Sequence, residues 1–193
     1  GGSDLFTDWG TPTVWWQLLK YELGFSVNAP YTLDDMAGDS IAVLDAEGHE
    51  RVHVMGVSMG GMIAQVLAAK FPNRIKTLTS VMSTTFAPHL PPPSSAAEDN
   101  LRDLADGDAE ASREELMRAR GFHPESMERH LMAIFKTGDR TLEVQTITAP
   151  TLVLHGSEDP LIPPAHGVHT AQQIAGAKFV PVSYTHLRAH ETS

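Results

Sequence analysis

Apolar and polar positions alternate along the chain in a way that predicts strands and helices in succession. From Arg51 to Lys70 a short apolar strand passes through glycines into a run with helical spacing, which ends before Pro72. The same patterns predict further strands over 75–82, 151–156 and 177–181, and helices from Leu33 toward Gly48 and over 166–175. Alternation of strand and helix predicts an α/β protein with a parallel, doubly wound sheet.

The pattern changes between the second and third of these strands. Residues 87–140 contain a proline run and an acidic stretch with few apolar positions, which suit helices over about 96–105, 113–120 and 125–136. We expect this segment to be a helical cap inserted into a core made of residues 1–86 and 141–181. A disordered acidic loop over 88–112 is the alternative. A short helix near 14–23 is also expected.

Composition narrows the class of protein. The formal charge is −10 and the basic residues are scattered, which argues against binding to nucleic acid or to an anionic membrane surface. The absence of cysteine excludes disulfides and thiolate metal sites. No apolar run has the length needed to span a bilayer. We expect a cytoplasmic protein acting on a small molecule, and the sequence indicates no oligomeric state.

The turn between the first strand and its helix carries candidate chemistry. Gly56-Val-Ser-Met-Gly60 has the form G-x-S-x-G, with a strand before it and a helix after it. A strand that reverses into a helix this sharply exposes the hydroxyl of Ser58, and we expect Gly56 and Gly60 to be glycines because a Cβ would clash there. The Met59 N–H would point toward a developing oxyanion. The alternative is an incidental serine in a glycine-rich turn.

A serine nucleophile needs a base and a carboxylate that orients the base. Asp159 follows the strand over 151–156, at the carboxyl edge where open α/β sheets bind ligands. Glu158 is the competing carboxylate, and an Asp that merely forms a turn before Pro160 is the alternative.

These motifs resemble the α/β-hydrolase superfamily. Gly56-Val-Ser-Met-Gly-Gly61 is similar to its nucleophile elbow, and His155-Gly-Ser-Glu-Asp-Pro-Leu-Ile-Pro163 to its acid loop. The resemblance implies a Ser58–His–Asp159 triad, no cofactor and hydrolysis of a carboxylic ester or similar acyl group. Pro30-Tyr-Thr-Leu-Asp-Asp-Met36 and the long cap resemble the branch containing aclacinomycin methylesterase. A proline iminopeptidase-like peptidase and a non-catalytic binding module remain alternatives.

The resemblance is incomplete at both ends. Gly1-Gly-Ser3-Asp4 resembles the glycine-rich stretch after the family's fourth strand, so the earlier strands and the second oxyanion donor are expected to be missing. The residues from about 182 onward can be back-translated into a nucleotide sequence that resembles a sequencing adapter. We therefore expect residues 182–193 to be a non-native tail. The catalytic histidine would then lie outside the chain, and His186 or His190 as base is the alternative. We also expect the strand at 52–55 to lack its neighbouring third strand, which leaves an apolar edge unpaired and prone to aggregation.

The remaining histidines have simpler interpretations. His155 is expected to pack beside the acid loop. His166 and His169 are three apart on one helix face, a spacing that can bind metal. Because no carboxylates are placed to complete such a site, we expect none.

Overall fold

The computed structural model describes residues 27–97 and 124–183, with the backbone alone described for 124–128. The chain divides into two compact units. One unit comprises residues 33–94 and 139–193, and it contains the sheet. The other comprises residues 1–32 and 95–138, and it contains helix α6 (Pro124–Thr137). The structure leaves the division into core, cap and tail as a prediction.

A four-stranded sheet forms the first unit, in the order β1-β2-β3-β4. All three neighbouring pairs are parallel, which confirms the expected sheet type. Because neighbouring parallel strands end on the same side of the sheet, the loops that follow all four strands lie at one edge, the carboxyl edge. The strands are β1 (Val52–Val57), β2 (Ile75–Val81), β3 (Thr151–Gly156) and β4 (Lys178–Val182).

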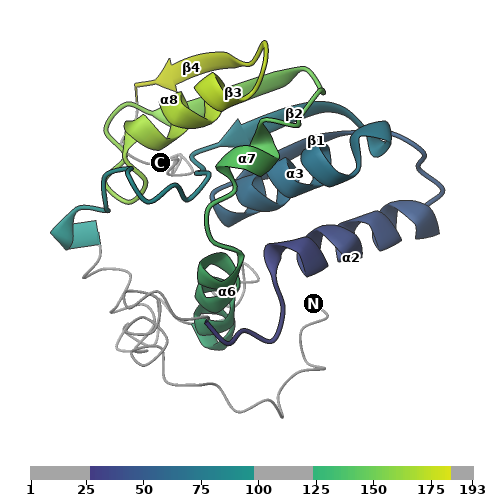
Figure 1. Ribbon diagram of the computed structural model, residues 1–193, viewed down its shortest axis with the longest axis horizontal. Coiled ribbons are helices and arrows are strands. Elements are labelled where there is room, and N and C mark those ends of the chain that lie inside the picture. The colour runs from purple at the N-terminus through teal and green to yellow at the C-terminus, as the bar shows by residue number, and fades with distance from the viewer. Residues whose placement is uncertain (1–26, 98–123, 184–193) are drawn as a thin grey trace, which may run out of the picture. The chain divides into compact units, whose positions relative to one another are not determined.

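The connecting helices gather on one face of this sheet (Figure 1). Helix α3 (Met59–Lys70) packs on β1 and β2, and α8 (Pro164–Gln173) packs on β3 and β4. Helix α2 (Leu33–Ala46) packs against α3, and the single turn α7 (Thr141–Val144) contacts both α3 and α8. A 3₁₀ turn, η2 (Pro72–Arg74), leads into β2. The core therefore lies between the strands and these helices.

One face of the sheet is covered by helices and the other is exposed at β1. On the helix side, Leu78 of β2 and Val153 of β3 are buried. On the other side of β1, Met55 is 68% exposed and Val57 is 41% exposed. Parallel sheets normally have both faces covered, and no described helix of this unit packs on the second one. The outer face of β1 thus exposes Met55 and Val57 to solvent in the described part of the chain.

The element bounds agree closely with those expected from the sequence. The helix before β1, the elbow helix and the helix after β3 are all present, as is the helix expected over 125–136. The short segments η2 and α7 were not predicted. The helices expected over 14–23 and 113–120, and most of that over 96–105, lie outside the described residues. None of the described helices is both long enough and apolar enough to cross a membrane.

Candidate functional site

Ser58 occupies the sharp turn between β1 and α3. Its φ and ψ are 54° and −121°, a combination that costs a residue with a side chain about 1–3 kcal/mol. The turn is held because the Ser58 N–H donates to the Val81 carbonyl of the neighbouring strand (2.9 Å), while its own carbonyl accepts the first helical bonds of α3. The Ser58 hydroxyl has no hydrogen-bond partner among the described residues, and the side chain is half-buried.

Two glycines are crowded at this turn: Gly56, as expected, and Gly61 in place of Gly60. A Cβ on Gly56 would lie 2.0 Å from the carbonyl oxygen of Gly60, and a Cβ on Gly61 would lie 2.6 Å from the Ser83 Cβ. Gly60 itself has nothing within 4 Å of its Cβ position. The expectation that Gly60 avoids a clash of its own side chain was therefore wrong. Gly60 contributes its backbone to the close approach, and Gly61 is the second crowded position.

The helix α3 begins immediately after the serine. Met59 is its first residue, so its N–H is one of the donors without an intrahelical acceptor. No hydrogen bond from this N–H is found in the described part of the structure. The positive end of the helix dipole adds to the attraction for an anion at this point.

Asp159 is buried in the loop after β3, where only 6% of it is exposed. Its Oδ1 accepts hydrogen bonds from the N–H groups of Leu161 (2.9 Å) and Ile162 (3.0 Å). Two backbone donors on one oxygen fix the carboxylate and leave Oδ2 to act on something else. The competing Glu158 is exposed.

His155, a residue of β3, contacts the same loop. Its Nε2–H donates to the Ile162 carbonyl (2.7 Å), and Nε2 lies 3.9 Å from Asp159 Oδ2. Its Nδ1 is buried without a partner in the described structure, and a Cβ on Gly167 would lie 2.5 Å from that atom. Both ring nitrogens are therefore enclosed, and His155 is packed as part of the acid loop.

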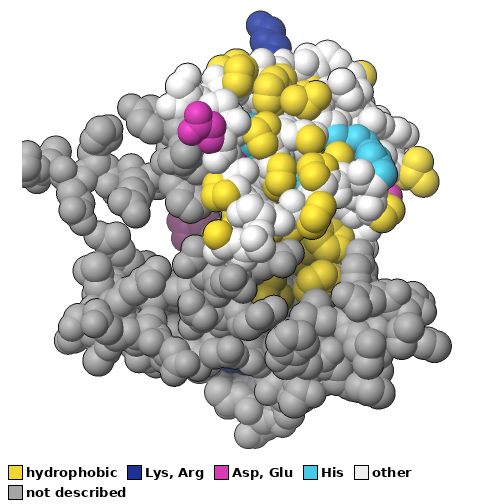
Figure 2. Space-filling model, turned by 90° about the vertical axis from the view of Figure 1, so that its left-hand side faces the viewer, with side chains coloured by type: hydrophobic (Ala, Val, Ile, Leu, Met, Phe, Trp, Pro, Cys, Tyr) yellow, Lys and Arg dark blue, Asp and Glu magenta, His cyan; other side chains and the backbone are white. Residues whose placement is uncertain are grey.

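Ser58 and Asp159 follow strands that are separated by one strand in a parallel sheet, so both lie at its carboxyl edge. Figure 2 looks onto the side toward which the strands run in Figure 1, and hydrophobic side chains gather there with few charged ones. The loops after β2 and β3 contribute the partly exposed Leu90, Leu161 and Ile162. Neither loop contains lysine or arginine over residues 82–94 and 156–166.

The histidines of α8 also turn toward the loop after β2. His166 donates from Nε2 to the Pro91 carbonyl (2.9 Å), and its Nδ1 is 2.7 Å from the Thr84 hydroxyl. Burial is the main cause that lowers the pKa of His166. The rings of His89 and His169 meet edge to face at 4.9 Å. No cluster of metal-ligating side chains is present in residues 27–97 and 124–183.

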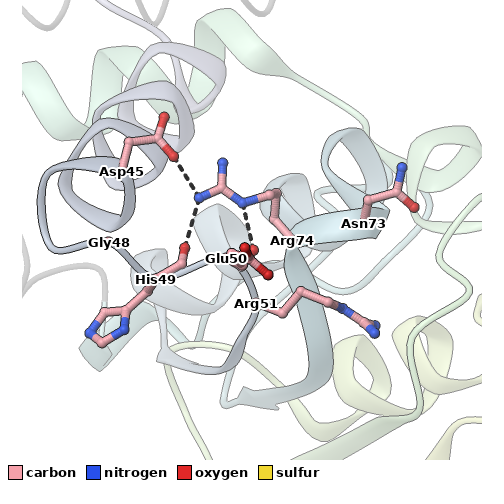
Figure 3. Close-up of a pocket in the computed structure, with 7 residues that line it drawn as sticks. All are labelled: Asp45, Gly48, His49, Glu50, Arg51, Asn73 and Arg74. Atoms are coloured by element: carbon pink, nitrogen blue, oxygen red, sulfur yellow. Dashed lines mark hydrogen bonds and ion pairs between the residues drawn. The ribbon is translucent and has the colours of Figure 1, made fainter.

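An open depression of about 480 Å³ lies at the opposite edge of the sheet, where β1 and β2 begin. Figure 3 shows Arg74 reaching across it to Asp45 and to the backbone before β1. Arg74 donates to the Glu50 carbonyl (2.7 Å), the His49 carbonyl (2.9 Å) and the Asp45 carboxylate (2.6 Å). These bonds anchor the turn between α2 and β1, and the depression is remote from Ser58 along β1.

The sequence profile of the α/β-hydrolase fold matches residues 9–118, more than half of the 193-residue chain. The chain belongs to the α/β-hydrolase family. The expected fold class and family are thereby confirmed.

Among its relatives, this α/β-hydrolase is 27% identical to rhodomycin D methylesterase DnrP of Streptomyces peucetius and 29% identical to DauP of Streptomyces sp. strain C5. Each match covers 79% of this chain, which spans 66% of the length of either relative. The structure superposes on a crystallised hydrolase from Pseudomonas aeruginosa with a TM-score of 0.62 and 26% identity, covering 82% of this chain and 66% of that one.

Sequence reasoning missed one buried residue of this α/β-hydrolase. Arg140 is only 2% exposed, and its guanidinium donates to the Gln65 side chain (2.9 Å) and to the carbonyls of Met62 (3.2 Å) and Thr84. Burial lowers its pKa to about 10. An arginine just before a short helical turn reads as a surface residue, and no local pattern predicts that it is buried.

Proposed function

We propose that this chain carries the nucleophile and the acid of a serine hydrolase that cleaves carboxylic esters. The observation that carries the proposal is the backbone of Ser58, a non-glycine residue held at a φ of 54° between a strand and a helix. Strain of this kind persists where the surrounding structure enforces it, and it clusters at functional sites. Ser58 would attack the ester carbonyl with its hydroxyl.

Asp159 would orient the catalytic base. It is buried at the same edge of the sheet as Ser58, and two backbone N–H groups hold one of its oxygens. A carboxylate in this role accepts the N–H of an imidazole and stabilises the imidazolium that forms when the serine proton is taken. Glu158 is exposed and has no such anchoring among the described residues, which favours Asp159 over it.

The base itself would be a histidine other than those described near the site. His155 donates from Nε2 to the acid loop and its Nδ1 is enclosed, while both ring nitrogens of His166 are engaged with the loop after β2. His186 and His190 lie outside the described residues. The Met59 N–H would supply one donor to the tetrahedral oxyanion, and one such donor is worth about 3 kcal/mol of transition-state stabilisation.

The names of the relatives and the side chains at the carboxyl edge of the sheet both support a class of substrate. DnrP and DauP are methylesterases, which supports an ester with a small alcohol group. The loops after β2 and β3 offer apolar side chains without lysine or arginine, which suits an uncharged acyl group. We therefore expect neutral esters to be cleaved without a cofactor.

Substitution of the nucleophile tests the proposal. In the full-length protein, Ser58→Ala should lower kcat for p-nitrophenyl acetate at least about 1,000-fold, because the residual rate rests on binding and oxyanion contacts alone. Ser40→Ala serves as the control, since among the described residues the Ser40 hydroxyl bonds within α2, to the Met36 carbonyl (2.9 Å). Turnover that survives Ser58→Ala would remove Ser58 as nucleophile, whereas a wild-type protein that cleaves no ester would favour a non-catalytic binding module.

A further inference from the structure

In the described part of the chain, the strained non-glycine residues lie in two turns that follow neighbouring strands. Among the described non-glycine residues, three have positive φ: Ser58 (54°), Met82 (44°) and Phe86 (64°). Ser58 follows β1, and the other two flank the loop that follows β2, the neighbouring strand. Because a positive φ costs a residue with a side chain about 1–3 kcal/mol, contacts elsewhere must hold this loop.

One such contact joins the loop directly to the elbow. The Ser83 hydroxyl donates to the Ser58 carbonyl (2.9 Å), and the Ser83 Cβ occupies the space that a side chain on Gly61 would need. Ser83 is 2% exposed, so this bond is shielded from water. A movement of the loop therefore moves the peptide group that follows the candidate nucleophile.

Arg140 fastens the same loop from the other side. Its guanidinium donates to the Thr84 carbonyl, and its backbone N–H donates to the Thr85 carbonyl (2.9 Å). The other end of the guanidinium reaches α3, where it donates to the Met62 carbonyl (3.2 Å) and the Gln65 side chain (2.9 Å). One side chain thus ties the loop after β2 to the helix that begins at the elbow.

Arg140 does this at an electrostatic cost. It is buried without a carboxylate in direct contact among the described residues, and burial lowers its pKa to about 10. The charges of Glu143, Asp139 and Asp34 act in the opposite direction. Buried charges are commonly no more stabilising than apolar side chains of similar size. Fold stability alone is therefore a weak reason for an arginine here.

We propose that Arg140 is a positioning residue for Ser58, an inference that rests on the proposed function. It holds the strained loop Met82–Phe86 against α3, and through Ser83 this loop fixes the elbow peptide. The hydroxyl of Ser58 and the N–H of Met59 then keep the geometry that attack on an ester requires. Arginine suits the task because its planar fork reaches both α3 and Thr84 at once, which a single ammonium cannot do.

Kinetics of the full-length protein test this inference. Arg140→Met and Arg140→Lys should each lower kcat for a neutral ester about 10- to 100-fold with KM changed less than about threefold, since misplacement of the reacting groups affects the chemical step. Lys70→Met is the matched control: it also replaces a cation by methionine, but Lys70 is the exposed last residue of α3 and pairs with Asp34 (2.6 Å). The control should keep kcat within about twofold of wild type.

A double variant separates positioning from folding. In Arg140→Met/Gln65→Met the buried donor and one of its acceptors are both replaced by apolar groups. Gln65→Met by itself also removes the bond from Gln65 to the buried Ser80 hydroxyl (3.0 Å), so the melting temperature of the double variant should fall by less than the sum of the falls in the two single variants. The kcat should stay low, because the Thr84 carbonyl is still released. Recovery of kcat in the double variant would overturn the inference and leave Arg140 a structural residue.

Hydrogen exchange supplies a readout that does not depend on turnover. In Arg140→Met, the peptides covering 56–62 and 82–87 should exchange faster than in wild type, while peptides of β3 and β4 stay unchanged. Unchanged exchange at the elbow overturns the inference even when the enzyme is inactive. If instead wild-type hydrolysis does not depend on Ser58, the proposed function fails, and the exchange result still decides whether Arg140 holds the elbow.

Discussion

The two ends of the parallel sheet are built differently. At the carboxyl edge, Ser58 is strained and the polar side chains of Ser83, Asp159 and Arg140 are buried and hydrogen-bonded. At the amino edge, the α2–β1 turn is held by Arg74, whose partner Asp45 has a side chain that is 61% exposed. Buried polar bonds are costly to leave unpaired, whereas exposed ion pairs contribute little. The carboxyl edge is thus the end where the chain tolerates strain and polar burial.

The largest effect is expected at the acid. Asp159→Asn keeps the shape of the side chain but removes the charge that stabilises the imidazolium, so kcat for a neutral ester should fall about 10,000-fold in the full-length protein. Glu158→Gln is the matched control, because it removes a neighbouring carboxylate that is exposed. A larger loss in Glu158→Gln than in Asp159→Asn would assign the acid to Glu158.

The next effect concerns the turn itself. Gly56→Ala places a Cβ 2.0 Å from the Gly60 carbonyl oxygen, a backbone atom, and it should lower the free energy of unfolding by about 3 kcal/mol. Gly60→Ala meets no atom within 4 Å and should be neutral or stabilising by up to about 1 kcal/mol. Urea denaturation of both variants measures this. Equal destabilisation would show that the close approach at the elbow is not as tight as described.

Much of the fold was predictable because the apolar periodicity is strong. The runs around Val54 and Val153 are bounded by glycine or proline and become strands, and the spacing from Met62 to Lys70 becomes a helix. The position of Ser58 was predictable for the same reason, since the G-x-S-x-G spacing sits between those two signals. Local sequence carries this information because it concerns residues that are close along the chain.

The rest of the site depends on contacts between distant residues. Arg140 and Thr84 are 56 positions apart, and no local pattern relates them. The importance of Gly61 could not be read either, because it arises from Ser83 on another strand's loop. The G-x-S-x-G motif points to Gly60 instead, because it describes the spacing of residues within one segment of the chain. What the sequence missed is therefore the packing between the elbow and the loop after β2.

A smaller effect is expected at the amino edge. Arg74→Met removes two bonds to backbone carbonyls and one exposed ion pair, and it should lower the free energy of unfolding by about 1–2 kcal/mol. The kcat for an ester should not change, because the substitution lies at the other end of β1 from Ser58. Thermal melting and turnover of the same preparation measure both quantities. A loss of kcat without a loss of stability would contradict the contrast between the two edges.

The smallest effect is a dependence of stability on pH at the carboxyl edge. Burial lowers the pKa of His166 below its ordinary value of 6.5, with His155 and His89 lowering it further and Asp159 and the Pro91 bond opposing this. The unfolded chain then binds more protons than the folded one at mildly acidic pH. The contribution of neutral His166 to the free energy of unfolding is therefore fully present above about pH 6.5, and it is lost as the pH falls through the lowered pKa.

Replacement of His166 by glutamine separates this contribution from the general acid sensitivity of the protein. A glutamine can still donate to the Pro91 carbonyl and accept from the Thr84 hydroxyl, but it does not titrate. Between pH 7.5 and pH 5.5 the melting temperature of His166→Gln should therefore fall less than that of wild type. The melting temperature of His49→Gln, a variant at the exposed amino edge, should fall as much as that of wild type. An equal loss in His166→Gln would mean that protonation of His166 does not release the loop after β2. The two edges would then respond to acid alike.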